Sequence, residues 1–471
     1  MWKRIPICLL YIVFAFFVNA EITLPSLIAD NMVLQQQTDV KLWGRATPNR
    51  KVKVHTTWSS ESYNVKSDTN GDWLLAIKTP VAGGPYTISF NDGIEKKVTN
   101  VMIGEVWLCS GQSNMEMTMK GYPGQPVSEA QNTLASADPS IPIRFMTVEK
   151  NNSLFPLDNI QSKWRENSSL YLKDLSALAY YYGLFLQSVL KVPVGIIVSS
   201  WGGSNIETWM DSTTLSQFKK VKLTNTGNPD VVFQRDCQLY NGMIYPLHNF
   251  AIKGVLWYQG ESNVGQEKLY KQQFPAMVAQ WRKLWNIGDF PFYYAQIAPW
   301  KYKGVQATTS ARFREMQQNL RLEVPNTEIV ATVDTGDSLV IHPPMKKLIG
   351  ERFAYVVLNK TYNCQGIEYR TPEFKSMTIS NDTIMLDFKN AEDGLNSKTR
   401  PITGFEIAGI NRIFKPARAA LVKKGVIKLT ESTISNPVAA RYAFKNYSPV
   451  SLFSNLGFPL VPFRTDNWED K

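Results

Sequence analysis

The stretch that decides the fold is EVWLCSGQSNMEM, which runs from Glu105 to Met117. Its first part, Val106 to Cys109, has the length and apolarity of a buried strand, and the small and polar residues after it turn the chain out at the strand's carboxyl end. Ligands bind at that edge of open α/β sheets, so Ser113 stands where a nucleophile would stand. A serine in a turn is usually a cap or a turn former, so Ser113 needs partners from elsewhere.

Three later apolar runs also end in polar or glycine-rich turns, as expected if several strand ends converge on one pocket. The residues that follow these runs and complete a set for acyl transfer are Gly202 and Gly203, Asn263, and His342.

Each of these residues can supply a group that acyl transfer requires. An imidazole can take a serine proton near neutral pH, which makes His342 the candidate base for Ser113. A tetrahedral intermediate needs prepositioned donors for its negative oxygen, which the backbone N–H groups of Ser113 and of Gly202 or Gly203 could supply together with the Asn263 amide. The pattern therefore predicts acyl transfer by a serine nucleophile, with no metal or cofactor.

Five blocks of the chain resemble the sialate O-acetylesterase family of the SGNH (GDSL-like) hydrolase superfamily. They are GQSNMEM at 111–117, SSWGGSNIETWM at 199–210, LYNGMIYPL at 239–247, IKGVLWYQGESN at 252–263 and IHP at 341–343. The order of serine, glycine, asparagine and histidine matches the superfamily, and shorter matches continue towards the C-terminus. The resemblance implies hydrolysis of O-acetyl esters on carbohydrates, with O-acetylated sialic acid as the expected substrate.

The sequence departs from the family just before His342. The family often has an acid two residues before the histidine, and the superfamily commonly has one three residues before it, whereas this chain has Val340 and Leu339. The nearest carboxylates are Asp337 and Asp334. Either could fold back to the imidazole, or a backbone carbonyl could orient it; we favour a Ser–His dyad or an acid elsewhere in the chain.

Two pairs of residues are candidates for holding the sugar. Trp201 and Trp300 follow strand-like runs and could face a sugar ring, and Arg312 and Arg314 could bind the carboxylate of a sialic acid. Two alternatives stay open. The ester could be on xylan or another polysaccharide, since fold does not determine substrate, or the protein could be a non-catalytic carbohydrate-binding protein, a reading that Val340 supports.

Composition narrows the partners of the protein. The 471 residues carry 51 Lys and Arg against 40 Asp and Glu, a formal net charge of +11, but no basic block is long enough to indicate nucleic-acid binding. Only 3 histidines and no C-x-x-C pair are present, which argues against a metal site. Oligomeric state is not readable from the sequence.

Residues 1–20 have the form of a signal peptide, with Lys3 and Arg4 before an apolar core and a cleavage site after Ala20. We therefore expect a periplasmic or secreted protein with no membrane span after cleavage. Removal of this segment leaves Cys109, Cys237 and Cys364, so at most one internal disulfide can form, and Cys237–Cys364 is the candidate pair.

Behind the signal peptide we expect three regions. Residues 21–100 alternate short strand-like runs with glycine turns, as in a β-sandwich-like domain. Residues 101–364 alternate strand-like and helical runs, which predicts a parallel sheet wrapped by helices, and the resemblance implies an SGNH-type three-layer α/β/α catalytic domain. Residues 365–471 return to short strands and form a β-rich region.

Overall fold

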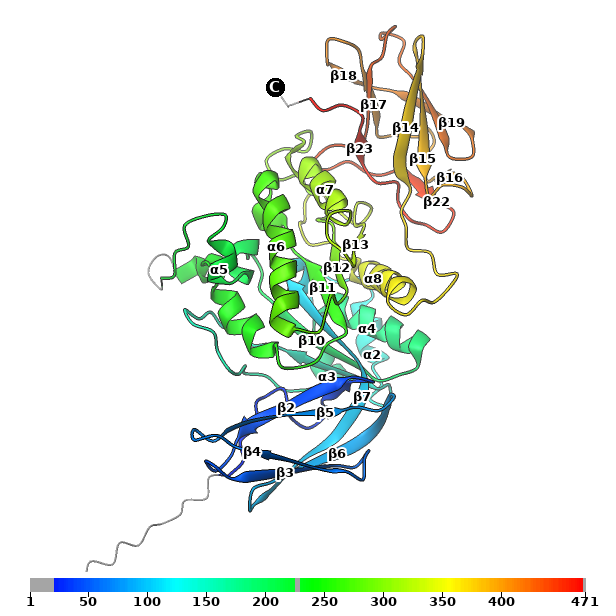
Figure 1. Cartoon of the computed structure of the whole chain (residues 1–471). Helices are drawn as coiled ribbons and strands as arrows, with labels where there is room; N and C mark the ends of the chain where they lie inside the picture. The colour runs from blue at the N-terminus through cyan, green and yellow to red at the C-terminus, as the bar shows by residue number, and fades with distance from the viewer. Residues whose placement is uncertain (1–20, 225–228, 469–471) are drawn as a thin grey trace, which may run out of the picture.

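The computed structural model describes residues 21–224 and 229–468, so the expected signal peptide at 1–20 lies outside the described residues. The chain is mixed α/β, as the sequence predicts, with β-rich regions at both ends of a central region that contains the long helices (Figure 1). Within the described part of the chain, no helix is both long and apolar enough to cross a membrane.

The N-terminal region is built from short strands whose side chains alternate between the core and solvent. In β3, Val52 and Val54 are buried while the residues between them are exposed, which is the pattern of a sheet with one covered face. β3 pairs with β4 and β6, and β2 pairs with β5. The strands are β1 (Val33–Gln35), β2 (Asp39–Arg45), β3 (Lys51–Thr56), β4 (Ser62–Lys66), β5 (Asp72–Lys78) and β6 (Gly83–Asn91).

One strand, β7 (Glu95–Gly111), belongs to both the N-terminal and the central region. Its first half pairs with β6 and β1, and its second half pairs with β10 and β11. Burial alternates up to Met102 and is complete from Ile103 onward, because the second half has both faces covered. The boundary expected at residue 100 therefore falls inside a continuous strand.

The central sheet has the strand order β13-β12-β11-β7-β10-β8-β9. All neighbouring pairs are parallel except β8 with β9. The strands that join β7 are β8 (Ile143–Thr147), β9 (Arg165–Glu166), β10 (Val194–Ser200), β11 (Gly254–Tyr258), β12 (Phe292–Ala295) and β13 (Thr327–Val330).

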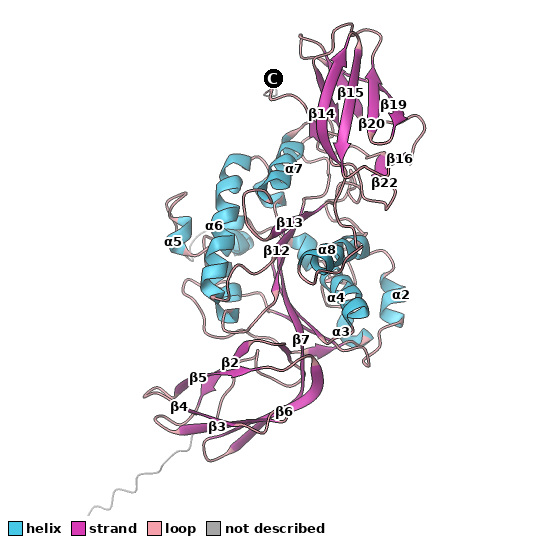
Figure 2. Ribbon diagram, turned by 45° about the vertical axis from the view of Figure 1, so that its right-hand side comes forward, coloured by secondary structure: helices cyan, strands magenta, loops and turns pink. Residues whose placement is uncertain are grey.

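Helices cover the two sides of this sheet (Figure 2). α4 (Ala177–Leu190) and α8 (Lys346–Lys360) pack together on one side, and α6 (Glu267–Trp285) and α7 (Thr309–Leu320) lie on the other. The shorter helical segments are α1 (Ser113–Glu116), α2 (Ala130–Ala135), α3 (Ser169–Leu172), α5 (Ser212–Leu215), η1 (Ile206–Trp209), η2 (Pro229–Gln234), η3 (Tyr240–Ile244), η4 (Tyr245–Leu247) and η5 (Glu261–Asn263).

The C-terminal region is a set of small antiparallel sheets with its own apolar core. It lies at the end of the central region away from the N-terminal strands (Figure 1). Its strands are β14 (Glu373–Ser380), β15 (Thr383–Lys389), β16 (Leu395–Ser397), β17 (Phe405–Ala408), β18 (Phe414–Pro416), β19 (Arg418–Lys423), β20 (Val426–Thr430), β21 (Ala439–Tyr442), β22 (Leu452–Ser454) and β23 (Phe463–Arg464).

Cys109, Cys237 and Cys364 all carry free thiols, so the candidate Cys237–Cys364 disulfide is not formed. Cys109 lies in the interior of β7, where burial raises the pKa of its thiol far above the ordinary value. It is a buried apolar side chain and not a second nucleophile.

Candidate active site

Ser113 is the first residue of α1, directly after the carboxyl end of β7. The turn between strand and helix depends on Gly111, whose φ is 135° and where a Cβ would lie 2.1 Å from the Tyr258 carbonyl oxygen of β11. Only glycine tolerates both conditions. The close approach of β11 to this glycine brings the serine to the edge of the sheet where the sequence places it.

His342 meets Ser113 across the site, with its Nε2 2.9 Å from the Ser113 Oγ. The imidazole comes from the loop between β13 and α8, and the ring of Tyr122 stands edge-on to it with 5.0 Å between ring centroids. Burial, and then the charge of Lys346, lower the pKa of His342 from 6.5 to about 4. The ring is therefore neutral near pH 7 and able to accept the serine proton.

The other imidazole nitrogen, Nδ1, lies 2.6 Å from the Oε1 of Gln125. An amide oxygen only accepts, so this contact holds the hydrogen on Nδ1 and leaves the lone pair of Nε2 for the serine hydroxyl. Ser113, His342 and Gln125 thus form a chain of two hydrogen bonds in which an amide takes the place of the carboxylate of a catalytic triad.

The two aspartates considered as supporting acids are engaged elsewhere. Asp334 forms a two-point ion pair with Arg352, at 2.7 and 2.8 Å, and Asp337 accepts a 2.7 Å hydrogen bond from the Leu339 N–H. Asp334 holds its loop to α8, and Asp337 closes a tight turn. The structure thus corrects the expectation that either could orient His342.

Gln125 is the residue that sequence reasoning missed. It lies in the segment GYPGQP, 217 positions from His342, which reads as an ordinary turn. Gly121 and Gly124 take φ values of 76° and 70°, and backbone hydrogen bonds join Tyr122 to Gln125. The turn is built tightly enough to present both side chains to His342.

The glycine loop after β10 lies against the nucleophile. A Cβ on Gly202 would be 3.2 Å from the Ser113 Cβ, and Gly203 lies against the ring of Phe233. The Gly202 N–H donates a hydrogen bond to the carboxylate of Glu116, which also forms a 2.7 Å ion pair with Lys150. An internal carboxylate therefore occupies a donor that was expected to serve the oxyanion.

Asn263 is buried at the end of β11 in a hydrogen-bonded network. Its Oδ1 accepts from the Ile206 N–H and from Gln259, and its Nδ2 donates to Glu207 at 3.1 Å. These contacts anchor η5 to η1. Across the residues that the structure describes, no protein group accepts a hydrogen bond from the N–H of Ser113 or of Gly203.

A second network lies directly behind the nucleophile. The Asn114 amide donates to Glu261 at 2.6 Å and to the Ile341 carbonyl at 3.2 Å, and its oxygen accepts from Lys346 at 2.6 Å. Burial lowers the pKa of the Lys346 ammonium to about 7 and raises the pKa of Glu261. Asn114, the residue after the nucleophile, is thereby hydrogen-bonded to Ile341, the residue before the base.

Of the residues proposed to hold the sugar, Trp201 contacts a residue next to the Ser113 site. Trp201 lies under the Lys150 ammonium, 5.6 Å from the ring centroid, whereas Trp300 packs edge-on against Tyr302. Arg314 is buried and donates to the Lys445 carbonyl, and Arg312 donates to the Trp468 carbonyl. The two arginines fasten α7 to the C-terminal region, which corrects their expected role in binding a carboxylate.

A serine hydrogen-bonded to a neutral imidazole at the carboxyl end of a parallel sheet is the arrangement of a serine hydrolase. No group of three or more His, Cys, Asp or Glu that could hold a metal ion occurs in the described ranges. A family model described as carbohydrate esterase, sialic acid-specific acetylesterase, matches residues 103–359. That match covers more than half of the chain, which therefore belongs to this family of carbohydrate esterases.

Individual relatives are similar over different shares of the chain. Human sialate O-acetylesterase (Homo sapiens) is 32% identical over 300 residues, 58% of this chain and 56% of the human one. The mouse protein of the same name (Mus musculus) is 26% identical over 423 residues, 75% of this chain and 76% of its own. A solved carbohydrate acetylesterase from Xanthomonas citri has a TM-score of 0.85 and 32% identity, covering 95% of this chain and 100% of that one. The match to the human protein thus spans just over half of its length.

Proposed function

We propose that this protein is a serine esterase that hydrolyses O-acetyl esters on carbohydrates. The observation that carries the proposal is the 2.9 Å contact between Ser113 Oγ and His342 Nε2, with Nδ1 held by Gln125. Membership of a carbohydrate esterase family supports the substrate class. The same membership and the order of the four site blocks support an SGNH-type α/β/α arrangement for the central region.

In the proposed reaction, Ser113 Oγ attacks the acetyl carbonyl while His342 takes its proton. The N–H groups of Ser113 and Gly203 are free to receive the oxyanion, Asn263 lies at the neighbouring strand end, and Gly202 joins them when Glu116 moves aside. The His342 imidazolium then gives this proton to the sugar oxygen as its bond to the acetyl carbon breaks. In the second half of the reaction, the imidazole takes a proton from a water that attacks the acyl-enzyme, and the imidazolium returns the proton to Ser113 Oγ as acetate leaves.

The first substrate we propose is an O-acetylated sialic acid, which is the sugar named in the family description and in the mammalian relatives. A second candidate is a neutral acetylated polysaccharide such as acetylxylan. The observation in its favour is that Arg312 and Arg314 bind backbone carbonyls of the C-terminal region instead of lying at the site.

The test is acetate release from 9-O-acetylated sialic acid, acetylated xylan and 4-nitrophenyl acetate by wild type and Ser113→Ala. We expect the substitution to abolish release, while Ser188→Ala, on the exposed side of α4, leaves it unchanged. The substrate from which acetate is released faster, acetylated sialic acid or acetylated xylan, decides between the two candidates. Absence of turnover even of the aryl acetate would favour a non-catalytic carbohydrate-binding protein.

We also propose that the protein is exported, on the basis of the signal-like residues 1–20. The measurement is the mass of the mature chain after expression with an intact N-terminus. Cleavage after Ala20 would support export, and retention of the full N-terminus would refute it.

A further inference from the structure

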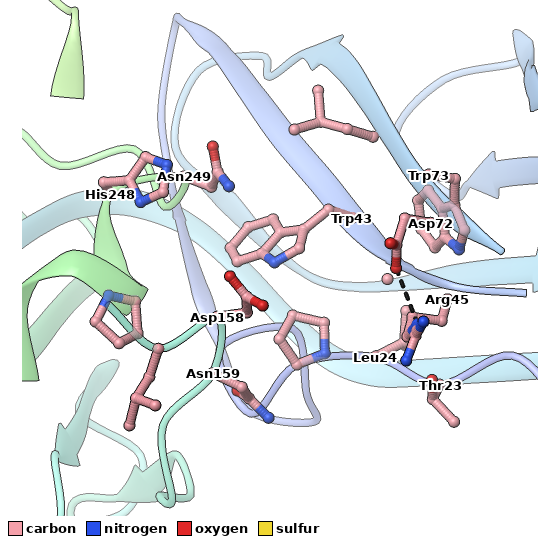
Figure 3. A pocket seen from close by; sticks show the side chains of 15 residues that line it. Thr23, Leu24, Trp43, Arg45, Asp72, Trp73, Asp158, Asn159, His248 and Asn249 are labelled. Atoms are coloured by element: carbon pink, nitrogen blue, oxygen red, sulfur yellow. Dashed lines mark ion pairs between the residues drawn. The ribbon is translucent and has the colours of Figure 1, made fainter. Parts of the chain in front are cut away.

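A groove of about 700 Å³ lies between the N-terminal strands and the central region (Figure 3). One wall is the β2–β5 ribbon, and the other is formed by residues 157–159 and by the end of η4 with residues 248–249; residues 23–25 also line the groove. The volume is within the range of ligand sites, roughly 300–1,000 Å³. No residue of the Ser113 site lines this groove.

The centre of the groove is the indole of Trp43 (Figure 3). Val40 and Leu42 of the same strand are buried in the N-terminal core, so Trp43 faces the other way, towards the central region, and is only half-buried. Leu74, its cross-strand partner in β5, is 47% exposed. A partly buried indole beside an exposed leucine offers an apolar face to the groove.

Polar groups with unused hydrogen-bonding capacity surround this apolar face. Asp158 is exposed, and its carboxylate has no hydrogen bond or ion pair with any described residue. Asn159 uses its Oδ1 on the N–H groups of Ser26 and Ile160, which leaves its amide hydrogens free. His248 uses Nδ1 on the Tyr245 carbonyl and leaves Nε2. The groove therefore presents both acceptors and donors around an aromatic face.

The charges of the groove indicate which kind of sugar it suits. Arg45 and Asp72 neutralise each other in a 2.9 Å ion pair, and the Lys41 ammonium is held by the Asn249 Oδ1 at 3.2 Å. Among the described lining residues, Asp158 carries the charge that has no ion-pair partner, and the Lys41 ammonium beside Asn249 keeps its positive charge because an amide oxygen does not neutralise it. Neither sign of charge predominates, so the groove suits a neutral sugar, whose hydroxyl groups can donate to the carboxylate and accept from the amide of Asn159.

We propose that this groove is a second carbohydrate-binding site, which holds neutral sugar residues of an acetylated oligosaccharide or polysaccharide. The apolar face of a pyranose ring stacks on Trp43, and its hydroxyl groups bind Asp158, Asn159 and His248. The proposal rests on the proposed function, because it assumes that the natural substrate is a carbohydrate. It deepens that function by assigning the enzyme a chain of sugars in place of a single free monosaccharide.

The fold connects the groove to the esterase site through one short segment. Lys150 pairs with Glu116 beside Ser113, and Asp158 lies in the groove eight positions later. Eight residues span at most about 29 Å when fully extended. A glycan of comparable length is long enough to reach from one place to the other, and binding to both would raise the local concentration of acetyl groups at Ser113.

The binding test uses Ser113→Ala as the parent protein, so that no probe is deacetylated. Migration is measured in native gels that contain acetylated xylan, acetylated glucomannan or submaxillary mucin. We expect Trp43→Ala to weaken retardation by at least one of the neutral polymers about tenfold and Asp158→Asn to weaken it by a smaller factor. The control, Trp58→Ala, removes a tryptophan of the same domain that packs on Tyr86 outside the groove, and it should migrate like the parent.

A kinetic test uses the same substitutions in the active protein. Trp43→Ala should leave kcat/KM for 4-nitrophenyl acetate unchanged and raise KM for the acetylated polymer. Equal behaviour of Trp43→Ala and the Trp58→Ala control on every glycan, or no retardation of the parent by any of them, would overturn the proposal. If the wild type turns over no acetate ester, the proposed esterase function is refuted. The gel result then still decides whether the groove binds a glycan, because binding is measured without turnover. Because Asp158 is an exposed surface residue, its variant tests the groove even if Trp43→Ala does not fold.

Discussion

At the scale of single residues, the most consequential contact is the one between His342 and Gln125. An amide carbonyl fixes the tautomer of the imidazole as a carboxylate would, but it carries no charge to stabilise the imidazolium that forms during attack. Gln125 therefore orients His342 as the acid of a catalytic triad would, but it stabilises the imidazolium less than a carboxylate would.

Substitution of Gln125 separates these two effects. We expect Gln125→Ala to lower kcat by about 10- to 100-fold, because the ring loses its orienting partner while the serine and the base stay in place. Gln125→Glu keeps the acceptor and adds a negative charge, which raises the pKa of His342 and moves the acidic limb of the rate profile to higher pH. The measurement is kcat and kcat/KM for 4-nitrophenyl acetate against pH.

The matched control for the charge is Gln365→Glu on the surface, which should leave the profile unchanged. An unchanged rate in Gln125→Ala would show that His342 needs no orienting side chain and that the pair works as a dyad.

The pH dependence of the wild type follows from the environment of His342. Only the neutral imidazole can accept the serine proton, and burial lowers its pKa to about 4. The value of kcat/KM should therefore hold through mildly acidic pH and fall only as the pH approaches 4. Because Lys346 also titrates near neutral pH, the decisive measurement is an NMR titration of the His342 ring, and a midpoint at the ordinary histidine value of 6.5 would contradict the lowered pKa.

At the scale of elements, the short helix α1 is joined to α8 and η5 by the side chain of Asn114. Lys346 of α8 and Glu261 of η5 are both buried, and each has one of its hydrogen bonds to this amide. A buried charge that loses its partner is costly, so the amide stabilises the fold around the site as well as its alignment.

Removal of this amide should affect stability and rate together. We expect Asn114→Ala to lower the free energy of unfolding by about 1–3 kcal/mol, because Lys346 and Glu261 lose a hydrogen-bond partner in the interior. The rate constant kcat should fall as well, since the Ile341 carbonyl beside His342 is released. Urea unfolding and aryl acetate turnover measure the two effects. Asn436→Ala, at an exposed position of the C-terminal region, is the control and should change neither.

The strands that lead into the site could be predicted from the sequence, because each is an apolar run that is followed closely by a site motif. Val106–Cys109 is apolar without interruption and ends in the Ser113 turn, and the β10 and β11 runs behave in the same way. Gln125 was not readable, because its contact depends on how a loop without periodicity folds over a histidine 217 positions away. The partners of the arginines in α7 depend on packing of the C-terminal region, which local pattern does not encode.

At the scale of the whole molecule, the C-terminal region is fastened to the central one through α7. Arg314 is 2% exposed and donates to the carbonyls of Lys445 and Asn446 at 2.5 and 3.4 Å. Arg321 of the turn after α7 pairs with Glu373 of β14 at 2.7 Å. These contacts lie at the boundary between the central and the C-terminal region. They join β14 and the loop at residues 445–446 to α7 and the turn after it.

Removal of the buried guanidinium should loosen this boundary. We expect Arg314→Ala to lower Tm and to expose the segment before β14 to proteases, because the Lys445 carbonyl loses its donor and the Asn446 carbonyl loses one of its donors. Limited proteolysis followed by mass analysis of the fragments is the measurement, with exposed Arg418→Ala as the control. An increase in KM for an O-acetylated sialic acid without any change in Tm would instead support the earlier expectation that Arg314 binds substrate.

The position of the Glu116 carboxylate has a consequence for the end of the reaction. It occupies the Gly202 N–H and is held there by Lys150, and it is chemically the same kind of group as the acetate ion that the esterase would release. Free acetate must compete for this donor with a tethered carboxylate at high effective concentration. Acetate should therefore bind the Gly202 N–H only weakly, and any inhibition by this product should come from the N–H groups of Ser113 and Gly203, for which no described residue competes.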